Sequence, residues 1–386
     1  MMKKRKKLKK WNKYLLLMAI IFIAIVLMHT LYCQNNKSVS KKVVIPKITT
    51  KKVSSNKLSM TLVGDCLIHS YVYKDALNAD GTYSFSKMFT EVASLIKNRD
   101  LAYYNQESNI GGSKLGISSY PRFNSPNEIG TDMVEVGFNM VSLANNHTLD
   151  KGEEGVLNSV AFWKTFPGVY TSGEAASLEE RNNIRIEEKN GIKYAMLSYT
   201  TITNGLNPAL GKEYLTNVYS NEKAKSDIDR IKNKVDLIIV AMHWGEEYYT
   251  NETAGQREIA NYLSSLGVNL IVGNHSHLIQ PVQMVNDTLV FYSLGNFISA
   301  QDTKDKLTGA LINLDINKKN GKIEFSNIKA NLIYTSFSYS IPRNFKIYPY
   351  TMLNNNILKN YELYYNKYKS ILNKYTNMVE VVNIND

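Results

Sequence analysis

Histidine, carboxylate and asparagine side chains recur at the ends of short apolar runs in this sequence of 386 residues. In VNLIVGNHSHLIQPVQ, residues 268–283, His275 and His277 directly follow a run of Val, Leu and Ile. A single His at a strand end is usually a polar cap, whereas two on alternating positions could converge on a metal ion. Five of the six histidines fall at such run ends, and the sixth, His29, lies in an apolar segment.

The side chains at the run ends form a mixed set of nitrogen and oxygen donors. Such donors suit Mn, Fe or Zn rather than a soft, thiolate-bound ion. They are too many for one tetrahedral zinc, and two divalent ions sharing a bridging carboxylate would use them better. Each unit alone also has an ordinary interpretation, such as a turn or a packed contact, so the metal hypothesis rests on the whole set. The set comprises Asp65, His69, Asn105, Glu107, Asn146, His147, His243, His275, His277 and Asn296.

The apolar runs themselves predict strands that are buried on both faces, because they are continuous rather than alternating. Amphipathic stretches at 85–98, 127–137 and 256–267 predict helices between several of them. Strands alternating with helices indicate an α/β fold, in which ligands collect beyond the carboxyl ends of the strands. The runs span residues 60–65, 100–107, 139–147, 236–245, 269–277 and 288–297.

The basic excess of the chain lies at its N-terminal edge. The formal net charge is +12, but residues 1–13 hold eight Lys and Arg, and residues 37–57 hold seven more. The remainder therefore has 31 basic against 34 acidic residues. A slightly acidic folded part argues against nucleic acid as a partner.

The basic N terminus is followed by an uncharged apolar stretch, YLLLMAIIFIAIVLMHTLYC, at residues 14–33. Its length predicts a single-pass signal anchor that contacts membrane lipid. The polybasic segment 1–13 should stay in the cytosol and the main domain should lie outside the cell. A cleaved signal peptide is the alternative, but the segment offers no small-x-small cleavage site. Residues 34–57 are polar and basic and predict a tether.

Six motifs, taken in order, resemble the CapA-type capsule-synthesis family associated with poly-γ-glutamate. They are VGDCLIH, YNQES, LANNHTLDKGEEG, MHWGEEY, GNHSHLIQPV and YSLGNF, and they cover about residues 58–300. The resemblance implies a calcineurin-like metallophosphatase fold, a layered α/β sandwich, behind an N-terminal transmembrane helix. It also implies a bacterial protein at the cell membrane.

The resemblance also implies roles for individual residues. Asp65, Glu107, Asn146, His243, His275 and His277 would bind the two metal ions. His147 would be the general acid, with Asp150 fixing its ring. The family's superfamily usually carries His two residues after the first Asp, where this chain has Leu67, and His69 is a candidate substitute. Arg122 and Asn296 are the candidate substrate-binding residues, although Arg122 could instead brace its own loop.

We expect the metallophosphatase-like domain to span residues 58–345, with a β-hairpin at 307–338 and a helical extension at 346–386. Two functional classes remain open. One is a metal-dependent hydrolase or transferase, phosphoesterase-like if active, that acts on an anionic surface polymer. The other is a non-catalytic, polymer-binding accessory subunit of a polyglutamate synthase complex with other membrane subunits. The chain has no P-loop motif, which argues against ATP-dependent ligation by this chain alone.

Overall fold

The computed structural model describes residues 18–32 and 56–385, and the chain divides into two compact units, Met1–Val53 and Ser54–Asp386. In the first unit, residues 18–32 form a helix. Among the described residues, no helix is both long and apolar enough to cross a membrane. The predicted membrane segment 14–33 is thus described only over 18–32. The predicted cytosolic segment and nearly all of the predicted tether lie outside the described residues, and the tether's last residue, Lys57, already begins a strand.

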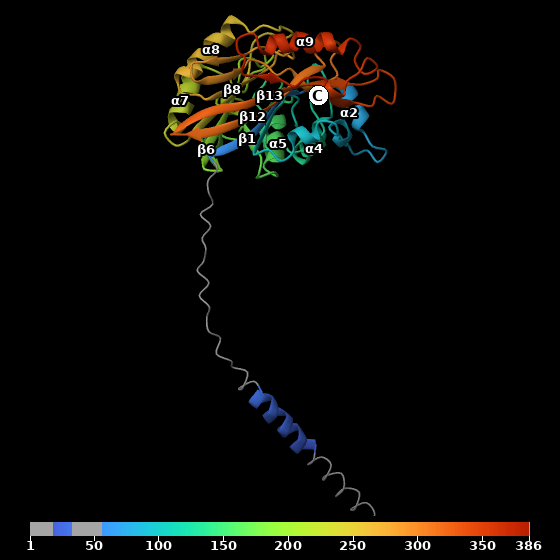
Figure 1. Ribbon diagram of the computed structural model, residues 1–386, viewed down its shortest axis with the longest axis vertical. Helices are drawn as coiled ribbons and strands as arrows, with labels where there is room; N and C mark the ends of the chain where they lie inside the picture. The colour runs from blue at the N-terminus through green and yellow to red at the C-terminus, as the bar shows by residue number, and fades with distance from the viewer. Residues whose placement is uncertain (1–17, 33–55, 386) are drawn as a thin grey trace, which may run out of the picture. The chain divides into compact units, whose positions relative to one another are not determined.

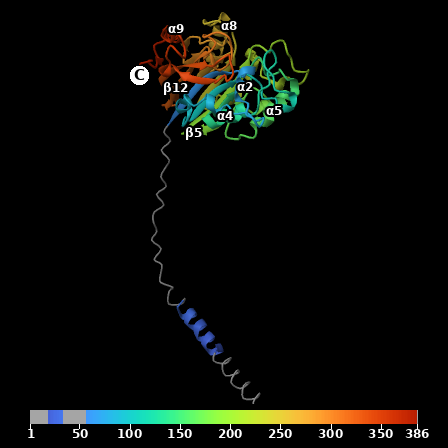
Figure 2. The ribbon, with the colours of Figure 1, turned by 90° about the vertical axis from the view of Figure 1, so that its right-hand side faces the viewer.

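Two β-sheets pack face to face in the second unit, and helices cover their outer faces (Figures 1 and 2). The strand order of the larger sheet is β14 (Lys346–Pro349), β13 (Lys322–Ser336), β12 (Thr308–Lys319), β1 (Lys57–Cys66), β2 (Leu101–Gln106), β3 (Met140–Ser142) and β4 (Tyr170–Ser172). Two short strands join this sheet beside that order: β11 (Asn296–Ile298) pairs with β1, and β15 (Glu380–Val381) pairs with β13.

The smaller sheet repeats the parallel arrangement. Its four central strands from β6 to β10 run parallel, as do β1 to β4 and β11 in the larger sheet. Carboxyl ends of several strands from both sheets can therefore meet at one edge. The strand order is β5 (Glu187–Lys189), β6 (Ile192–Thr200), β7 (Leu237–His243), β8 (Leu270–Asn274), β10 (Thr288–Phe291) and β9 (Val282–Val285).

Three of the four apolar clusters among the described residues lie between or on the sheets. The first lies between the sheets, where Met60 and Tyr103 of the larger sheet share a core with Ile239 and Leu270 of the smaller one. The second packs helices on the larger sheet, and the third packs helices on the smaller sheet. This α/β/β/α layering confirms the predicted α/β class.

Two groups of helices cover the outer faces of the sheets, and the helix at 361–372 packs instead against the cluster shared by both sheets. In the group on the smaller sheet, α8 begins with a capping box in which Thr253 and Gln256 satisfy each other's backbone N–H groups. The α-helices are α2 (Ser70–Ala76), α3 (Ala93–Ile96), α4 (Glu128–Val136), α5 (Gly152–Trp163), α6 (Leu178–Asn182), α7 (Asn221–Ile231), α8 (Ala254–Ser265) and α9 (Tyr361–Leu372). Single 3₁₀ turns lie at Ser86–Met88, Ser113–Leu115, Glu213–Leu215 and Tyr350–Met352.

Several predicted elements differ from those observed. The predicted helix 85–98 is a 3₁₀ turn followed by the four-residue α3. The run 139–147 contributes only three strand residues before it turns. The segment 346–386, predicted as a helical extension, contains α9 but also β14 and β15, which join the larger sheet. The predicted hairpin 307–338 is present as β12 and β13.

Two glycines allow backbones to approach closely beside the strand ends. A Cβ atom added to Gly64 would lie 1.8 Å from the carbonyl oxygen of Gly295, and one added to Gly273 would lie 1.9 Å from that of Tyr292. Any side chain at either position would push the strands apart. These glycines stand just before Asp65 and just before Asn274–His275, so they fix the spacing of the residues described next.

Candidate metal centre

Two groups of three buried side chains converge at the carboxyl ends of the strands. Site 1 consists of Glu107, His243 and His275, and site 2 consists of Asp65, Glu107 and His277. In each group one ligand atom per residue lies within 4.8 Å of the others. Four strand ends, those of β1, β2, β7 and β8, thus supply ligands to one place, and Glu107 is common to both sites.

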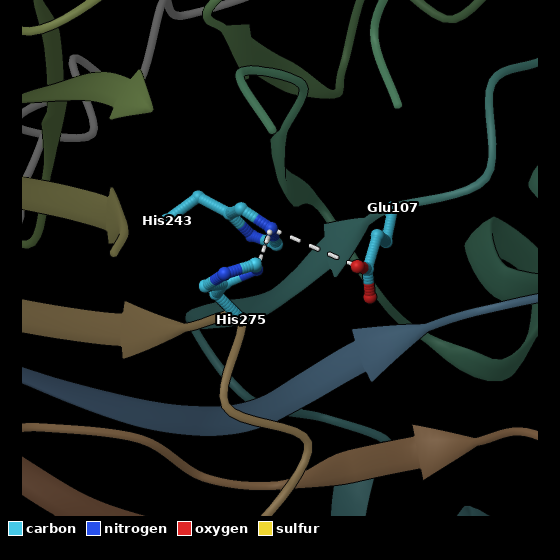
Figure 3. Close-up of side chains that lie close together, drawn as sticks. All are labelled: Glu107, His243 and His275. Carbon is cyan, nitrogen blue, oxygen red and sulfur yellow. Dashed lines mark hydrogen bonds and ion pairs between the residues drawn. The ribbon is translucent and has the colours of Figure 1, made fainter. Parts of the chain in front are cut away.

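Site 1 is drawn in Figure 3, where the Glu107 carboxylate faces the rings of His243 and His275. The Nε2 atom of His243 is 3.0 Å from Nδ1 of His275 and 3.7 Å from Oε1 of Glu107. The Oδ1 atom of Asn146 is 2.9 Å from the same Nε2. Two imidazole nitrogens, a carboxylate and an amide oxygen therefore surround one point.

Site 2 shares Glu107 with site 1. The Nε2 atom of His277 is 3.7 Å from Oε1 of Glu107, and its Nδ1 is 3.5 Å from Oδ2 of Asp65. Asn105 donates from Nδ2 to Oδ1 of Asp65 at 2.8 Å and also lies 3.4 Å from Nδ1 of His243. Asn105 therefore links a residue of site 2 to a residue of site 1.

Glu107 gives the clearest structural sign that a cation belongs here. It is fully buried, and neither of its carboxylate oxygens has a hydrogen-bond partner among the described residues. A buried carboxylate without partners is costly unless a positive charge compensates it. The donor set around Glu107 consists of imidazole, carboxylate and amide groups, which are the ligands that divalent Mn, Fe and Zn accept. The residues present therefore fit two such ions.

Burial changes the proton affinities of these groups. It raises the pKa of Glu107 well above its usual range and lowers the pKa of His243 well below its usual range. It also lowers the pKa of His275 to about 4. Burial alone would lower the pKa of His277, but the carboxylates of Glu107 and Asp65 outweigh it and raise that pKa to about 9. The histidines of site 1 are thus neutral at pH 7, as metal ligation requires.

The turn that carries two of the ligands has a strained backbone. His275 and His277 have φ angles of 96° and 58°, in the left-handed region that non-glycine residues rarely adopt. The N–H of His275 donates to Oδ2 of Asp65 at 3.2 Å, which helps to hold the turn. Strain of this kind costs roughly 1–3 kcal/mol per residue and gathers at functional sites.

His147 and Asp150 form a pair beside site 1. The Nδ1 atom of His147 is 2.8 Å from Oδ2 of Asp150, which also accepts the backbone N–H of Phe123 at 2.6 Å. The Phe123 ring packs edge-on against His147 with 4.7 Å between ring centroids. An ionised carboxylate only accepts, so Nδ1 of His147 carries the hydrogen and Nε2 is left for proton transfer.

The structure places the three remaining predicted site residues differently from one another. His69 lies outside both metal groups, where its Nδ1 accepts the N–H of Ala300 at 3.3 Å. Asn296 is buried beside His277, and its Oδ1 is 3.0 Å from Nδ1 of that residue. Arg122 lines a cavity next to His147.

Both polar atoms of the Asn296 side chain have hydrogen-bond partners within the protein. Its Nδ2 donates to Gln301 Oε1 at 2.8 Å, to the Lys306 carbonyl at 2.7 Å and to Ser299 Oγ at 3.2 Å. These contacts fix Oδ1 toward His277. Asn296 is therefore placed to orient the ring of His277.

Sequence reasoning did not single out Tyr248 as a site residue. Its ring centroid lies 5.9 Å from that of His277, and Nζ of Lys306 lies over the Tyr248 ring, 3.9 Å from its centroid. It reaches this position with a φ of 68°, and its N–H donates to the Ser276 carbonyl at 2.8 Å. A positive φ at a tyrosine leaves no signal in the residue pattern.

Comparison with known proteins finds the same family that the six motifs resemble. The family model for "Bacterial capsule synthesis protein PGA_cap" matches residues 59–301. The chain is 28% identical over 316 residues to the "Capsule biosynthesis protein CapA" of Bacillus anthracis, covering 78% of this chain and 72% of that protein. It is 26% identical over 284 residues to the "PGA biosynthesis protein CapA" of Bacillus subtilis, covering 69% of this chain and 70% of that protein.

Among solved structures, the chain is similar to the calcineurin-like phosphoesterase YfkN from Bacillus subtilis, with 16% identity and a TM-score of 0.43 over 72% of this chain and 90% of that one. The family match spans more than half of the chain and includes every residue of both metal groups. The chain belongs to the bacterial capsule synthesis protein family PGA_cap.

Proposed function

We propose that this chain is a bacterial cell-surface protein of poly-γ-glutamate capsule synthesis or export with a dinuclear metal centre that supports hydrolysis or transfer. The observation that carries the proposal is the position of Glu107, which is shared by two ligand groups and has two unpartnered, buried oxygens. Family membership supports the capsule role. The uncharged stretch 14–33 supports a single-pass anchor with the folded domain outside the cell.

Each residue of the centre has a role in this proposal. Asp65, Glu107 and His277 would hold one ion, and Glu107, His243 and His275 the other, with Asn146 completing the latter. Such ions, when bound, supply Lewis acidity and lower the pKa of water toward neutrality. Asn296 would keep the Nε2 atom of His277 directed into the centre, because Nδ1 donates to its Oδ1.

The protein's own acid would be His147. Asp150 accepts from Nδ1, so the imidazolium form of His147 would give its Nε2 proton to a leaving oxygen or nitrogen and keep the hydrogen on Nδ1. The backbone N–H of Phe123 donates to the same oxygen, Oδ2, and helps to hold Asp150 in place. The substrate would enter through the cavity that His147 lines.

A non-catalytic, polymer-binding accessory subunit of a polyglutamate synthase complex is the second candidate. A specific observation favours it: Leu67, which is buried, stands where the superfamily usually carries a His, and His69 lies outside both metal groups. A centre with this change could bind ions and polymer without turning over a substrate.

The test is a calorimetric titration of the metal-stripped protein with Mn²⁺, beside a His275→Ala, His277→Ala double variant. We expect two ions for the wild type and fewer for the double variant. His69→Ala is the matched control, since it removes a partly buried His outside both groups and should leave two ions. No Mn²⁺ binding by the folded wild type would exclude the metal mechanism. Two bound ions together with no hydrolysis of phosphodiester or γ-glutamyl amide probes would favour the accessory role.

A further inference from the structure

A cavity of about 350 Å³ opens beside the metal centre. Asn146 of site 1 and the His147–Asp150 pair form part of its wall, so it is the approach to the reacting position. Its volume is at the lower end of the range of ligand pockets, roughly 300–1,000 Å³. A cavity of this size suits a chain end of one or two residues better than a long stretch of polymer. Its other lining residues are Tyr120, Pro121, Arg122, Asn204, Leu206 and Glu247.

Arg122 contributes an available positive charge to this cavity. Its side chain is exposed, and its guanidinium makes no hydrogen bond or ion pair with any residue of the described ranges 18–32 and 56–385. The backbone beside it is held, because the next residue, Phe123, donates its N–H to Asp150. An anchored backbone with an unpaired guanidinium favours recognition of an anionic group such as a carboxylate.

Glu247 contributes a negative charge to the same cavity. Its side chain is 39% exposed, and its Oε1 is 3.9 Å from Nε2 of His277, beyond hydrogen-bond distance. Besides this 3.9 Å ion pair with His277, Glu247 contacts the side chain of Tyr248, and most of its acceptor capacity stays open. The other carboxylate of the cavity, Asp150, is engaged by His147 and Phe123. Glu247 is therefore the acid that a ligand would meet.

These opposite charges select among the parts of a γ-glutamyl chain. An interior unit carries one carboxylate and an uncharged amide nitrogen, so it would gain from Arg122 but be repelled by Glu247. The amino-terminal unit carries an ammonium group as well as a carboxylate. Only that end satisfies both side chains.

We infer that the cavity recognises the zwitterionic amino-terminal end of a γ-glutamyl chain, with its carboxylate at Arg122 and its ammonium at Glu247. This inference rests on the proposed function. It makes the protein specific for chain ends, so that the γ-amide next to the terminal unit is the bond presented to His147.

The test compares two probes by calorimetry on the full-length, Mn²⁺-loaded protein: γ-glutamyl-glutamate with a free amine, and its N-acetyl derivative. We expect the wild type to bind the free-amine probe at least tenfold more tightly. Glu247→Gln should abolish that preference, and Arg122→Gln should weaken both probes about tenfold. Glu246→Gln is the matched control, since this exposed neighbour lies outside the cavity lining and should change neither affinity.

Three results would overturn the inference. One is equal or tighter binding of the N-acetyl probe by the wild type, and another is no binding of either probe by protein that holds two Mn²⁺. The third is a loss of bound Mn²⁺ in Glu247→Gln, which would make Glu247 a metal ligand. The same pair of probes is titrated against metal-stripped protein, because neither Arg122 nor Glu247 needs an ion. A free-amine preference that persists in a protein unable to bind Mn²⁺ would support chain-end recognition while contradicting the proposed dinuclear centre.

Discussion

Buried charged side chains at two places in this fold differ in their hydrogen bonding. The first place is the metal centre around Glu107. The second is a cluster formed by Arg181 of α6, Tyr199 of β6, and Asp227 and Arg230 of α7, which we call the Arg181–Asp227 cluster. In that cluster, Arg181 pairs with Asp227 through two parallel bonds of 2.7 and 2.6 Å.

Every carboxylate oxygen of the Arg181–Asp227 cluster has a partner. Oδ2 of Asp227 accepts from Tyr199 at 2.7 Å as well as from Arg181, and Oδ1 also accepts from Arg230. Burial would raise the pKa of Asp227, but its bonds to Arg181 and Tyr199 outweigh burial and lower it. In the metal centre, by contrast, both oxygens of Glu107 lack partners among the described residues, and burial raises its pKa. A charge paired within the chain supports the fold, whereas two unpartnered oxygens that lie among other candidate ligands, as at Glu107, indicate a cation site.

Asp227→Ala should have the largest effect on stability. The substitution leaves the Arg181 guanidinium buried without its partner, which costs about 3–5 kcal/mol of unfolding free energy. Urea denaturation should give the same loss with and without Mn²⁺, because the cluster does not touch the centre. Lys225→Ala on the same helix, which removes an exposed ion pair with Asp229, is the control and should cost less than about 0.5 kcal/mol. A cost below about 1 kcal/mol for Asp227→Ala would contradict the claim that the paired charges of this cluster stabilise the fold.

Glu107→Gln should act in the opposite sense on the metal-free protein. Burial raises the pKa of Glu107 by more than the charge of His277 lowers it. At neutral pH this favours the unfolded state, where the carboxyl ionises freely, so the amide should stabilise the metal-free fold even though it removes the attraction to His277. The variant should also lose the stabilisation by Mn²⁺, about 2.7 kcal/mol for a wild type at a hundred times its dissociation constant. Thermal unfolding with and without Mn²⁺ measures both effects.

Glu174→Gln is the matched control for that change. Burial raises the pKa of Glu174 to about 8, and its Oε2 is buried without a partner among the described residues, but it lies outside both metal groups. Its amide variant should stabilise the metal-free protein while keeping the Mn²⁺ response. Loss of the Mn²⁺ response in Glu174→Gln, or its retention in Glu107→Gln, would contradict the assignment of Glu107 as the shared ligand.

Much of the centre could be predicted from the sequence, because strand ends can be recognised from residue patterns. His243 closes an apolar run, and His275 and His277 follow another, so parallel pairing brings all three to one edge of the fold. The orientation of the supporting residues could not be predicted in this way. Whether Asn296 faces the cavity or His277 depends on the three acceptors that hold its amide, and they come from the loop that follows β11.

The same limit applies to the helices. In the segment 85–98, the buried residues Phe85, Met88, Phe89, Val92 and Ile96 keep helical spacing. The backbone nevertheless forms a 3₁₀ turn and a short helix instead of one continuous element. Apolar spacing reports which side chains are buried, whereas an unbroken helix also requires each backbone hydrogen bond in turn.

The pH dependence of the metal-free protein should be a gradual effect, since one group changes stability by at most about 1.4 kcal/mol per pH unit. The pKa of His277 is raised from 6.5 to about 9 in the fold, with Glu107 and Asp65 outweighing burial. Its contribution is therefore complete below pH 6.5 and is lost as the pH rises through 9. The free energies of unfolding of wild type and His277→Gln, measured without metal, should differ most near pH 6 and converge above pH 9.

Mn²⁺ should reverse that trend in the wild type. Nε2 of His277 must give up its proton to bind a cation, so the stabilisation by the ion should grow over the same pH range in which the metal-free protein loses stability. The Arg181–Asp227 cluster contributes no such reversal, because its carboxylate has a lowered pKa and stays ionised throughout. A difference between wild type and His277→Gln that does not change from pH 6 to 9 would show that Glu107 and Asp65 do not hold the His277 proton. The two clusters would then differ only in hydrogen bonding, and the case for a cation at Glu107 would rest on its unpartnered oxygens alone.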